Sequence, residues 1–217
     1  HSHHHRNTFD PMNWQQNIDD QKSVFSLNIP GTHETCARVG VPRLHCQDLS
    51  VREQLNSGIR YLDIRCRHIN NVFLIHHDYL YEQIGFGLGV RDVCIEFLKL
   101  HPTEFIFMQI KEEYIAENNT RTFSETMQTY IKSYKDFFYL NEGVPTVEQV
   151  RGKIILLRRF SPVVEPQGNL LEFQDNAIFT SNTTIVARIQ DCYIVPSMLD
   201  RSIKWSEMMQ LFQEALV

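Results

Sequence analysis

The stretch EFIFMQIKEEY at residues 104–114 is an apolar run, interrupted by Gln109, that ends in a lysine and two glutamates. The stretch GKIILLRRF at residues 152–160 has the same plan, with four aliphatic residues in a row followed by two arginines. Strands that are apolar on both faces are typical of a parallel sheet covered by helices. Both stretches therefore predict inner strands of an α/β sheet.

Short apolar runs alternate with longer helical patterns along the rest of the chain. We predict strands at Val24–Ile29, Tyr61–Arg65, Val72–His76, Glu104–Ile110, Lys153–Arg158 and Ala187–Val195. We predict helices at about Leu49–Asn56, Val90–Leu100, Thr122–Tyr134 and Ser197–Leu216. We interpret the polar segment 161–185 as a long loop. The order of the elements is that of an α/β fold.

Composition narrows the class of protein. The chain has 217 residues with 42% hydrophobic residues, so one domain with a sizeable core is expected at 9–217, after a flexible His-rich start at 1–8. The formal net charge is −5, which disfavours a nucleic-acid or other polyanion binder. No apolar run reaches the roughly 18 residues that a transmembrane helix needs.

Cysteines and sequons suggest an oxidising compartment. The five cysteines include Cys36 and Cys46, which flank one short loop and form the best candidate pair. N-x-S/T sequons occur at Asn118 and Asn182. We therefore expect an extracellular protein.

Charged or imidazole side chains stand at the ends of all six predicted strands. They are His33-Glu34, Asp63 with Arg65, His76-His77, Lys111-Glu112-Glu113, Arg158-Arg159 and Asp191 with Tyr193. Each of these groups alone would more often be structural or solvated. Because an α/β barrel carries its chemistry just beyond the carboxyl ends of its strands, six such groups in the same relative place predict a site.

The residue types in this set suit phosphodiester chemistry. Two histidines from separate strands can act as general base and general acid. An arginine between them can form a fork of hydrogen bonds to phosphate oxygens and stabilise the transition state. The set suits in-line attack of a neighbouring hydroxyl on phosphorus, with a cyclic phosphodiester as product.

The sequence resembles the X domain of phosphatidylinositol-specific phospholipase C, of the small, metal-independent bacterial type. The resemblance covers about residues 20–200. Besides the two stretches quoted first, it is carried by NIPGTHET at 28–35, GIRYLDIRCR at 58–67, FLIHHDYLY at 73–81 and QDCYIV at 190–195. It implies a distorted TIM barrel.

The resemblance also implies catalytic roles. His33 is then the general base that takes the proton of the inositol 2-hydroxyl, and His77 is the general acid that protonates the diacylglycerol oxygen. Arg65 binds the phosphate, with Asp63 beside it. Glu34 stands where the family usually has aspartate.

The remaining site residues would bind substrate. The resemblance implies that Lys111, Arg159 and Asp191 contact inositol hydroxyls and that Tyr193 lies under the ring. It implies no metal and no other cofactor. The expected partner is phosphatidylinositol or a GPI-type lipid at a membrane surface, cleaved by a monomer to inositol 1,2-cyclic phosphate.

Two departures affect these expectations. Asp78-Tyr79 replaces the Gly-Pro that often follows the double histidine. Family members usually continue with the last barrel strands and an aspartate that pairs with the base histidine, whereas this sequence ends at Val217. A barrel that is incomplete at its C-terminus is therefore expected.

Two other functions are compatible with the same residues. A metal-dependent phosphodiesterase on a barrel would need a cluster of acidic ligands, but Arg65 stands where a second ligand would follow Asp63. A catalytically weak module that binds inositol phosphate through Lys111, Arg159 and Tyr193 is the alternative from a different class.

Overall fold

The computed structural model describes residues 10–32, 50–77, 80–174, 177–179 and 188–190. The strands are β1 Asn28–Thr32, β2 Tyr61–Ile69, β3 Val72–His77, β4 Leu80–Gly85, β5 Ile106–Glu112, β6 Phe138–Tyr139, β7 Ile154–Arg159, β8 Asn169–Leu170, β9 Glu172–Gln174, β10 Ala177–Phe179 and β11 Arg188–Gln190. The α-helices are α1 Val51–Asn56, α2 Asp92–Leu100, α3 Phe123–Ile131 and α4 Val147–Val150. Short 3-10 helices are Trp14–Asn17, Val24–Ser26 and Lys135–Phe137, and Gly87–Arg91 is a π-helix.

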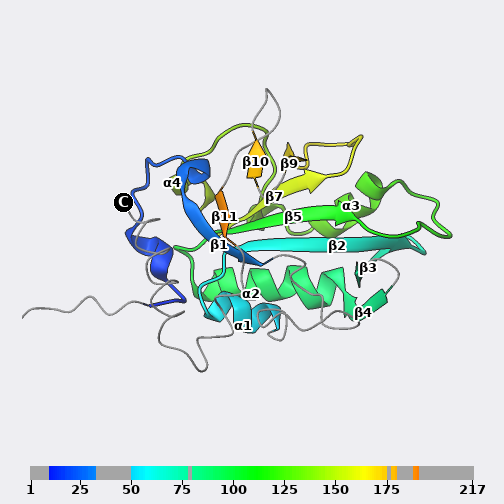
Figure 1. The fold of residues 1–217 in the computed structure, drawn as a ribbon, viewed down its shortest axis with the longest axis horizontal. Helices are drawn as coiled ribbons and strands as arrows, with labels where there is room; N and C mark the ends of the chain where they lie inside the picture. The colour runs from blue at the N-terminus through cyan, green and yellow to red at the C-terminus, as the bar shows by residue number, and fades with distance from the viewer. Residues whose placement is uncertain (1–9, 33–49, 78–79, 175–176, 180–187, 191–217) are drawn as a thin grey trace, which may run out of the picture.

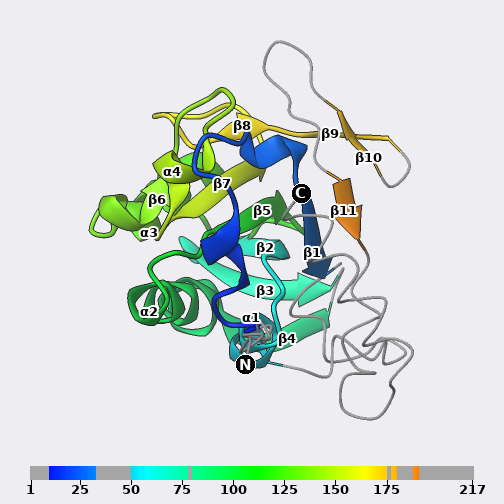
Figure 2. The ribbon, with the colours of Figure 1, turned by 90° about the vertical axis from the view of Figure 1, so that its left-hand side faces the viewer.

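The main sheet has the order β11-β1-β2-β5-β7-β6, and every neighbouring pair in this series is parallel. The hairpin partners β3 and β4 extend it antiparallel from β2. Figure 1 shows β2, β5 and β7 side by side. In Figure 2 these strands and β1 follow a curve, with α2 and α3 on its outer side. This arrangement confirms the predicted α/β fold.

Both faces of the inner strands are buried, as predicted. Along β5, Met108 and Ile110 belong to an outer core that includes side chains of α1, α2 and α3. Phe107 faces the other way, into an inner core with Tyr61 of β2 and Leu157 of β7. The alternation of side chains along a strand therefore assigns Gln109 and Lys111 to the inner face, with Phe107.

The amino end of the sheet is closed by the segment that precedes β1. The indole Nε1 of Trp14 donates to the carbonyl of Gly58 at 3.0 Å. Arg60, just before β2, forms an ion pair at 3.1 Å with Glu104, just before β5, and both side chains are fully buried. Burial lowers the pKa of Arg60 to about 10, against the opposing effect of the Glu104 carboxylate. Side chains and backbone of the protein therefore occupy the amino end of the barrel.

Two helices begin where the sequence offers a capping box. Ser50 accepts a hydrogen bond from the backbone N–H of Glu53, whose side chain accepts from the Ser50 N–H. Thr122 and Glu125 form the same arrangement at the start of α3. Because each box satisfies two N–H groups that the helix leaves unpaired, these starts are local properties of the sequence.

Several predicted elements were wrong in detail. The first strand was predicted at Val24–Ile29, but Val24–Ser26 is a 3-10 helix and the strand starts at Asn28. The reason is tertiary, because the Val24 N–H donates to the carbonyl of Pro145 from a distant loop. The segment 161–185, read as a loop, contains the short strands β8, β9 and β10. The predicted helix Ser197–Leu216 lies outside the described residues.

Residues 80–91 contain a strand and a π-helix that were not predicted. β4 was not expected, and a π-helix at Gly87–Arg91 precedes α2, whereas the predicted helix begins at Val90. Within the described residues, no helix combines the length and apolar character required to cross a bilayer.

Candidate active site

Three cationic residues lie side by side on the central strands, at the level where β5 and β7 end. Arg65 of β2 pairs in register with Lys111 of β5, and Lys111 pairs with Arg159 of β7. Residues at the same level of neighbouring parallel strands share a face, which here is the inner face. The strands therefore form a row of positive charge at one edge of the barrel interior. We call Arg65, Lys111 and Arg159 the cation row.

Asp63 lies one step deeper on the same face and is 4% exposed. Its Oδ2 accepts from Nη2 of Arg65 at 3.3 Å, and its Oδ1 accepts from Nε2 of Gln109 at 3.2 Å. The Tyr61 hydroxyl donates to Oε1 of Gln109 at 2.7 Å. This chain of hydrogen bonds anchors the carboxylate on the inner core.

A second carboxylate holds the other branch of the arginine. Nη1 of Arg65 lies 3.2 Å from Oε2 of Glu113, and the Arg65 side chain is 15% exposed. A guanidinium held by two carboxylates has a fixed orientation, which a bidentate phosphate contact requires. Glu113 therefore belongs to the site. The sequence predicts Glu113 only as part of a charged strand end, and its spacing of two from Lys111 indicates that the two side chains share a face.

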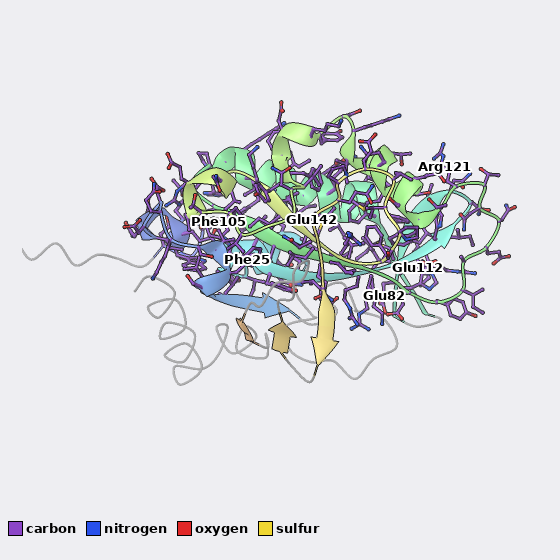
Figure 3. All side chains as sticks on the ribbon, turned by 90° about the horizontal axis from the view of Figure 1, so that it is seen from above. Phe25, Glu82, Phe105, Glu112, Arg121 and Glu142 are labelled. Atoms are coloured by element: carbon purple, nitrogen blue, oxygen red, sulfur yellow. The ribbon has the colours of Figure 1, made fainter. Side chains whose placement is uncertain are left out.

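Glu112 has a different environment from its two neighbours. Glu112 comes two residues after Ile110, so its side chain also lies on the outer face of the sheet. Figure 3 shows Glu112 at the opposite end of the strands from Phe105. Burial raises the pKa of its carboxyl. The three charged residues that end the predicted strand are thus divided between two faces, and Lys111 and Glu113 face the barrel interior.

The charged residues of the site influence one another's pKa values. Burial lowers the pKa of Arg159, and the positive charge of Arg65 adds to that effect, while the carboxylates of Asp63 and Glu113 oppose it. Burial also raises the pKa of Tyr61 well above its usual value, so its hydroxyl stays protonated. The described members include three cations and two carboxylates, so one positive charge is in excess. That excess matches a phosphodiester, which carries one negative charge.

Of the site residues predicted from the sequence, the structure brings Asp63, Arg65, Lys111 and Arg159 together. His77 ends β3, which runs back along β2 from Ile69 towards Arg65, and its side chain lies outside the described part. His33, Glu34, Asp191 and Tyr193 also lie outside the described residues, as does the expected pair Cys36–Cys46. Cys66 and Cys94 are buried and are not in disulfides.

The described residues contain no group of three or more His, Cys, Asp or Glu side chains arranged to hold a metal ion. The chemistry available in this part of the molecule is recognition of an anion by fixed guanidinium and ammonium groups. Such groups suit a phosphate ester whose charge grows during reaction.

Comparison with known proteins assigns this site to a family. Residues 32–160 match the family described as phosphatidylinositol-specific phospholipase C, X domain. A 1-phosphatidylinositol phosphodiesterase of Listeria monocytogenes is 33% identical over 165 residues, covering 70% of this chain and 50% of the relative. The protein of the same name from Staphylococcus aureus strain Newman is 30% identical over 204 residues, covering 84% of this chain and 64% of the relative.

A solved structure agrees with these sequence matches. A phosphatidylinositol-specific phospholipase C from Staphylococcus aureus superposes with a TM-score of 0.70 at 28% identity, covering 85% of this chain and 67% of that one. The likeness confirms the TIM-barrel-like α/β fold. The chain belongs to the phosphatidylinositol-specific phospholipase C X-domain family. It spans about half to two thirds of the length of these curated relatives.

Proposed function

We propose that this protein is a phospholipase C that cleaves the phosphodiester of phosphatidylinositol or of a GPI-type lipid. The products are diacylglycerol, or the corresponding lipid of a GPI anchor, and inositol 1,2-cyclic phosphate, which stays linked to the glycan when the substrate is a GPI-type lipid. The observation that carries the proposal is the cation row, in which Asp63 and Glu113 hold Arg65, at the end of a barrel of this family. Two of the relatives are named 1-phosphatidylinositol phosphodiesterase.

The proposed reaction has one chemical step. His33 takes the proton from the inositol 2-hydroxyl, and the oxygen attacks phosphorus to form the ring of the cyclic phosphodiester. The bond from phosphorus to the diacylglycerol oxygen breaks, and His77 donates a proton to that oxygen. Arg65 stabilises the negative charge that develops on the phosphate oxygens, since its guanidinium is already oriented by Asp63.

The other predicted residues bind the inositol. Lys111 and Arg159 follow Arg65 across the sheet, so they suit hydroxyl groups of a ring whose phosphate lies on Arg65. Asp191 and Tyr193 complete the proposed inositol site, with Tyr193 under the ring. Glu34 is proposed to act beside His33.

We also propose that the protein works outside the cell, as a monomer, at the surface of a membrane. Its substrate is a lipid. One similar solved structure, of the phosphatidylinositol-specific phospholipase C from Staphylococcus aureus, is described as concerning the modulation of its membrane binding. Sedimentation with phosphatidylinositol vesicles tests the membrane contact independently of cleavage.

The catalytic roles are tested by His33→Ala and His77→Ala. Each is expected to abolish release of inositol cyclic phosphate while the thermal unfolding midpoint stays that of wild type. His101→Ala is the matched control, because His101 lies at the amino end of the sheet, bonded to Asn13, and should keep full activity. Full activity of either site variant contradicts its role. Binding of inositol phosphate by the wild type without cleavage would instead favour a head-group binding module.

A further inference from the structure

A stack of four side chains lies beside the site at the end of β3. The Arg67 guanidinium carbon is 5.0 Å from the ring centroid of Tyr114. The Tyr114 centroid is 6.0 Å from that of His76, and their planes differ by 9°. The ring of His76 is also 5.7 Å from that of Tyr81. We call Arg67, Tyr114, His76 and Tyr81 the Tyr114 stack.

The backbone of Tyr114 is strained. Its φ is 60°, in the left-handed region. A bulky residue there is strained and persists only where the surrounding structure enforces it. Glycine would adopt this conformation without that strain. The position therefore holds an aromatic side chain at the expense of stability.

The segment around Tyr114 is tied to β2 on both sides, which enforces this conformation. The Glu113 N–H donates to the carbonyl of Cys66 at 2.8 Å, and the Glu117 N–H donates to the carbonyl of His68 at 3.1 Å. Between them, Nε of Arg67 donates to the carbonyl of Ile115 at 3.0 Å. The Tyr114 ring is thereby fixed against β3.

The contact between Tyr114 and His76 lies where the pairing of β3 with β4 is irregular. The register between β3 and β4 is irregular between Leu74 and His76, so the strand ladder is interrupted just before the double histidine. His76 is 4% exposed, and the ring of Tyr114 packs on it. His77 follows directly and pairs with Leu80. Packing on His76 therefore fixes the backbone from which His77 extends.

We propose that Tyr114 is a positioning residue for the general acid. Its ring, packed on His76, holds the end of β3 so that His77 meets the leaving oxygen of a phosphate bound to Arg65. Tyr114 directly follows Glu113, the residue that holds Arg65, so one short segment positions both groups. This inference rests on the proposed function, because it assigns Tyr114 a part in that reaction.

The proposal makes the effect of Tyr114 depend on the leaving group. A diacylglycerol oxygen leaves as a strongly basic alkoxide unless an acid protonates it, whereas nitrophenolate leaves without a proton. A misplaced acid therefore slows cleavage of phosphatidylinositol much more than cleavage of a nitrophenyl inositol phosphate. A general loss of structure would slow both substrates alike.

The test is Tyr114→Gly, which removes the ring and relieves the backbone strain together. The unfolding midpoint is expected to equal or exceed that of wild type. The kcat for phosphatidylinositol should fall about tenfold to a hundredfold with KM nearly unchanged, as for a small misplacement of a catalytic group. The kcat for the nitrophenyl substrate should fall much less. Tyr114→Phe, which keeps the ring, should cleave both substrates at the wild-type rates.

Asn118→Gly is the matched control, because Asn118 also has a positive φ, 55°, but lies outside the stack. It should leave both activities unchanged. The proposal is overturned if Tyr114→Gly cleaves phosphatidylinositol at the wild-type rate, slows both substrates equally, or loses activity in proportion to stability. Failure of the wild-type protein to cleave either substrate would contradict the proposed function instead.

Discussion

At the amino end of the strands the guanidinium of Arg60 is fully buried, whereas at the carboxyl end the side chain of Arg65 keeps 15% of its surface exposed. All five N–H donors of Arg60 have acceptors, supplied by Glu104 and by the carbonyls of Leu55, Ile59 and Pro11. Arg65 is instead oriented by carboxylates at the open edge of the barrel.

The difference shows how burial separates a structural ion pair from a binding one. Figure 3 shows Phe25 and Phe105 towards one end of the strands and Glu112 towards the other. A charge enclosed by protein is satisfied there and has no route to a ligand. A charge fixed at the strand ends can exchange water for a phosphate.

The largest expected effect is at Arg65. Arg65→Lys should lower kcat for phosphatidylinositol about 10²–10³-fold, because an ammonium group cannot form the bidentate fork. The unfolding midpoint should change little, since the side chain is not enclosed. Release of inositol cyclic phosphate measures the effect. A near-normal rate would remove Arg65 from the proposed mechanism.

The opposite pattern is expected at the amino end. Glu104→Ala leaves the buried charge of Arg60 uncompensated, which should lower the free energy of unfolding by about 3–5 kcal/mol. Denaturant unfolding gives the change. Activity per folded molecule should stay at the wild-type level, and a fall in kcat comparable to that of Arg65→Lys would show that the two ends are not independent.

A smaller effect is expected at Lys111. Lys111→Met removes one proposed contact to the inositol ring, which should raise KM about tenfold, the effect of about 1.4 kcal/mol. The control is Lys153→Met at the amino end of β7, where Nζ donates to the Asp136 carbonyl. Steady-state kinetics compare the two variants, and equal KM values would contradict the assignment of Lys111.

The smallest expected effect is on the pH dependence of stability, and it comes from a histidine that packs in the outer core. Burial lowers the pKa of His68, whose Nε2 lies 2.7 Å from Oγ1 of Thr126. The unfolded chain therefore binds the proton more tightly, so stability is complete above the usual pKa of about 6.5 and falls as pH drops through the lowered value. His68→Gln should reduce this slope between pH 7 and 5, as measured by thermal unfolding. An unchanged slope would contradict the assignment.

Much of the described site was predictable, since parallel strands deliver their carboxyl ends to one edge. Asp63, Arg65, Lys111 and Arg159 were found on this basis and on the family resemblance, and the structure brings them together. The role of Glu113 was missed because it depends on which side chains of neighbouring strands meet, which the sequence does not show.

Part of the fold was also predictable from the sequence. The inner strands β5 and β7 follow from local apolar runs, and the start of α3 follows from a capping box. The 3-10 helix at Val24 and the strained Tyr114 depend on contacts with distant segments, at Pro145 and β2. Local propensity carries no information on such contacts.

The most direct test of the account is phosphorus NMR of the products formed from phosphatidylinositol in the presence of EDTA. The account predicts a cyclic phosphodiester signal that appears first and at the same rate as without EDTA, because guanidinium and imidazole groups perform the reaction in the proposed mechanism. Conversion that stops with EDTA, or a phosphomonoester formed with no cyclic precursor, would contradict it.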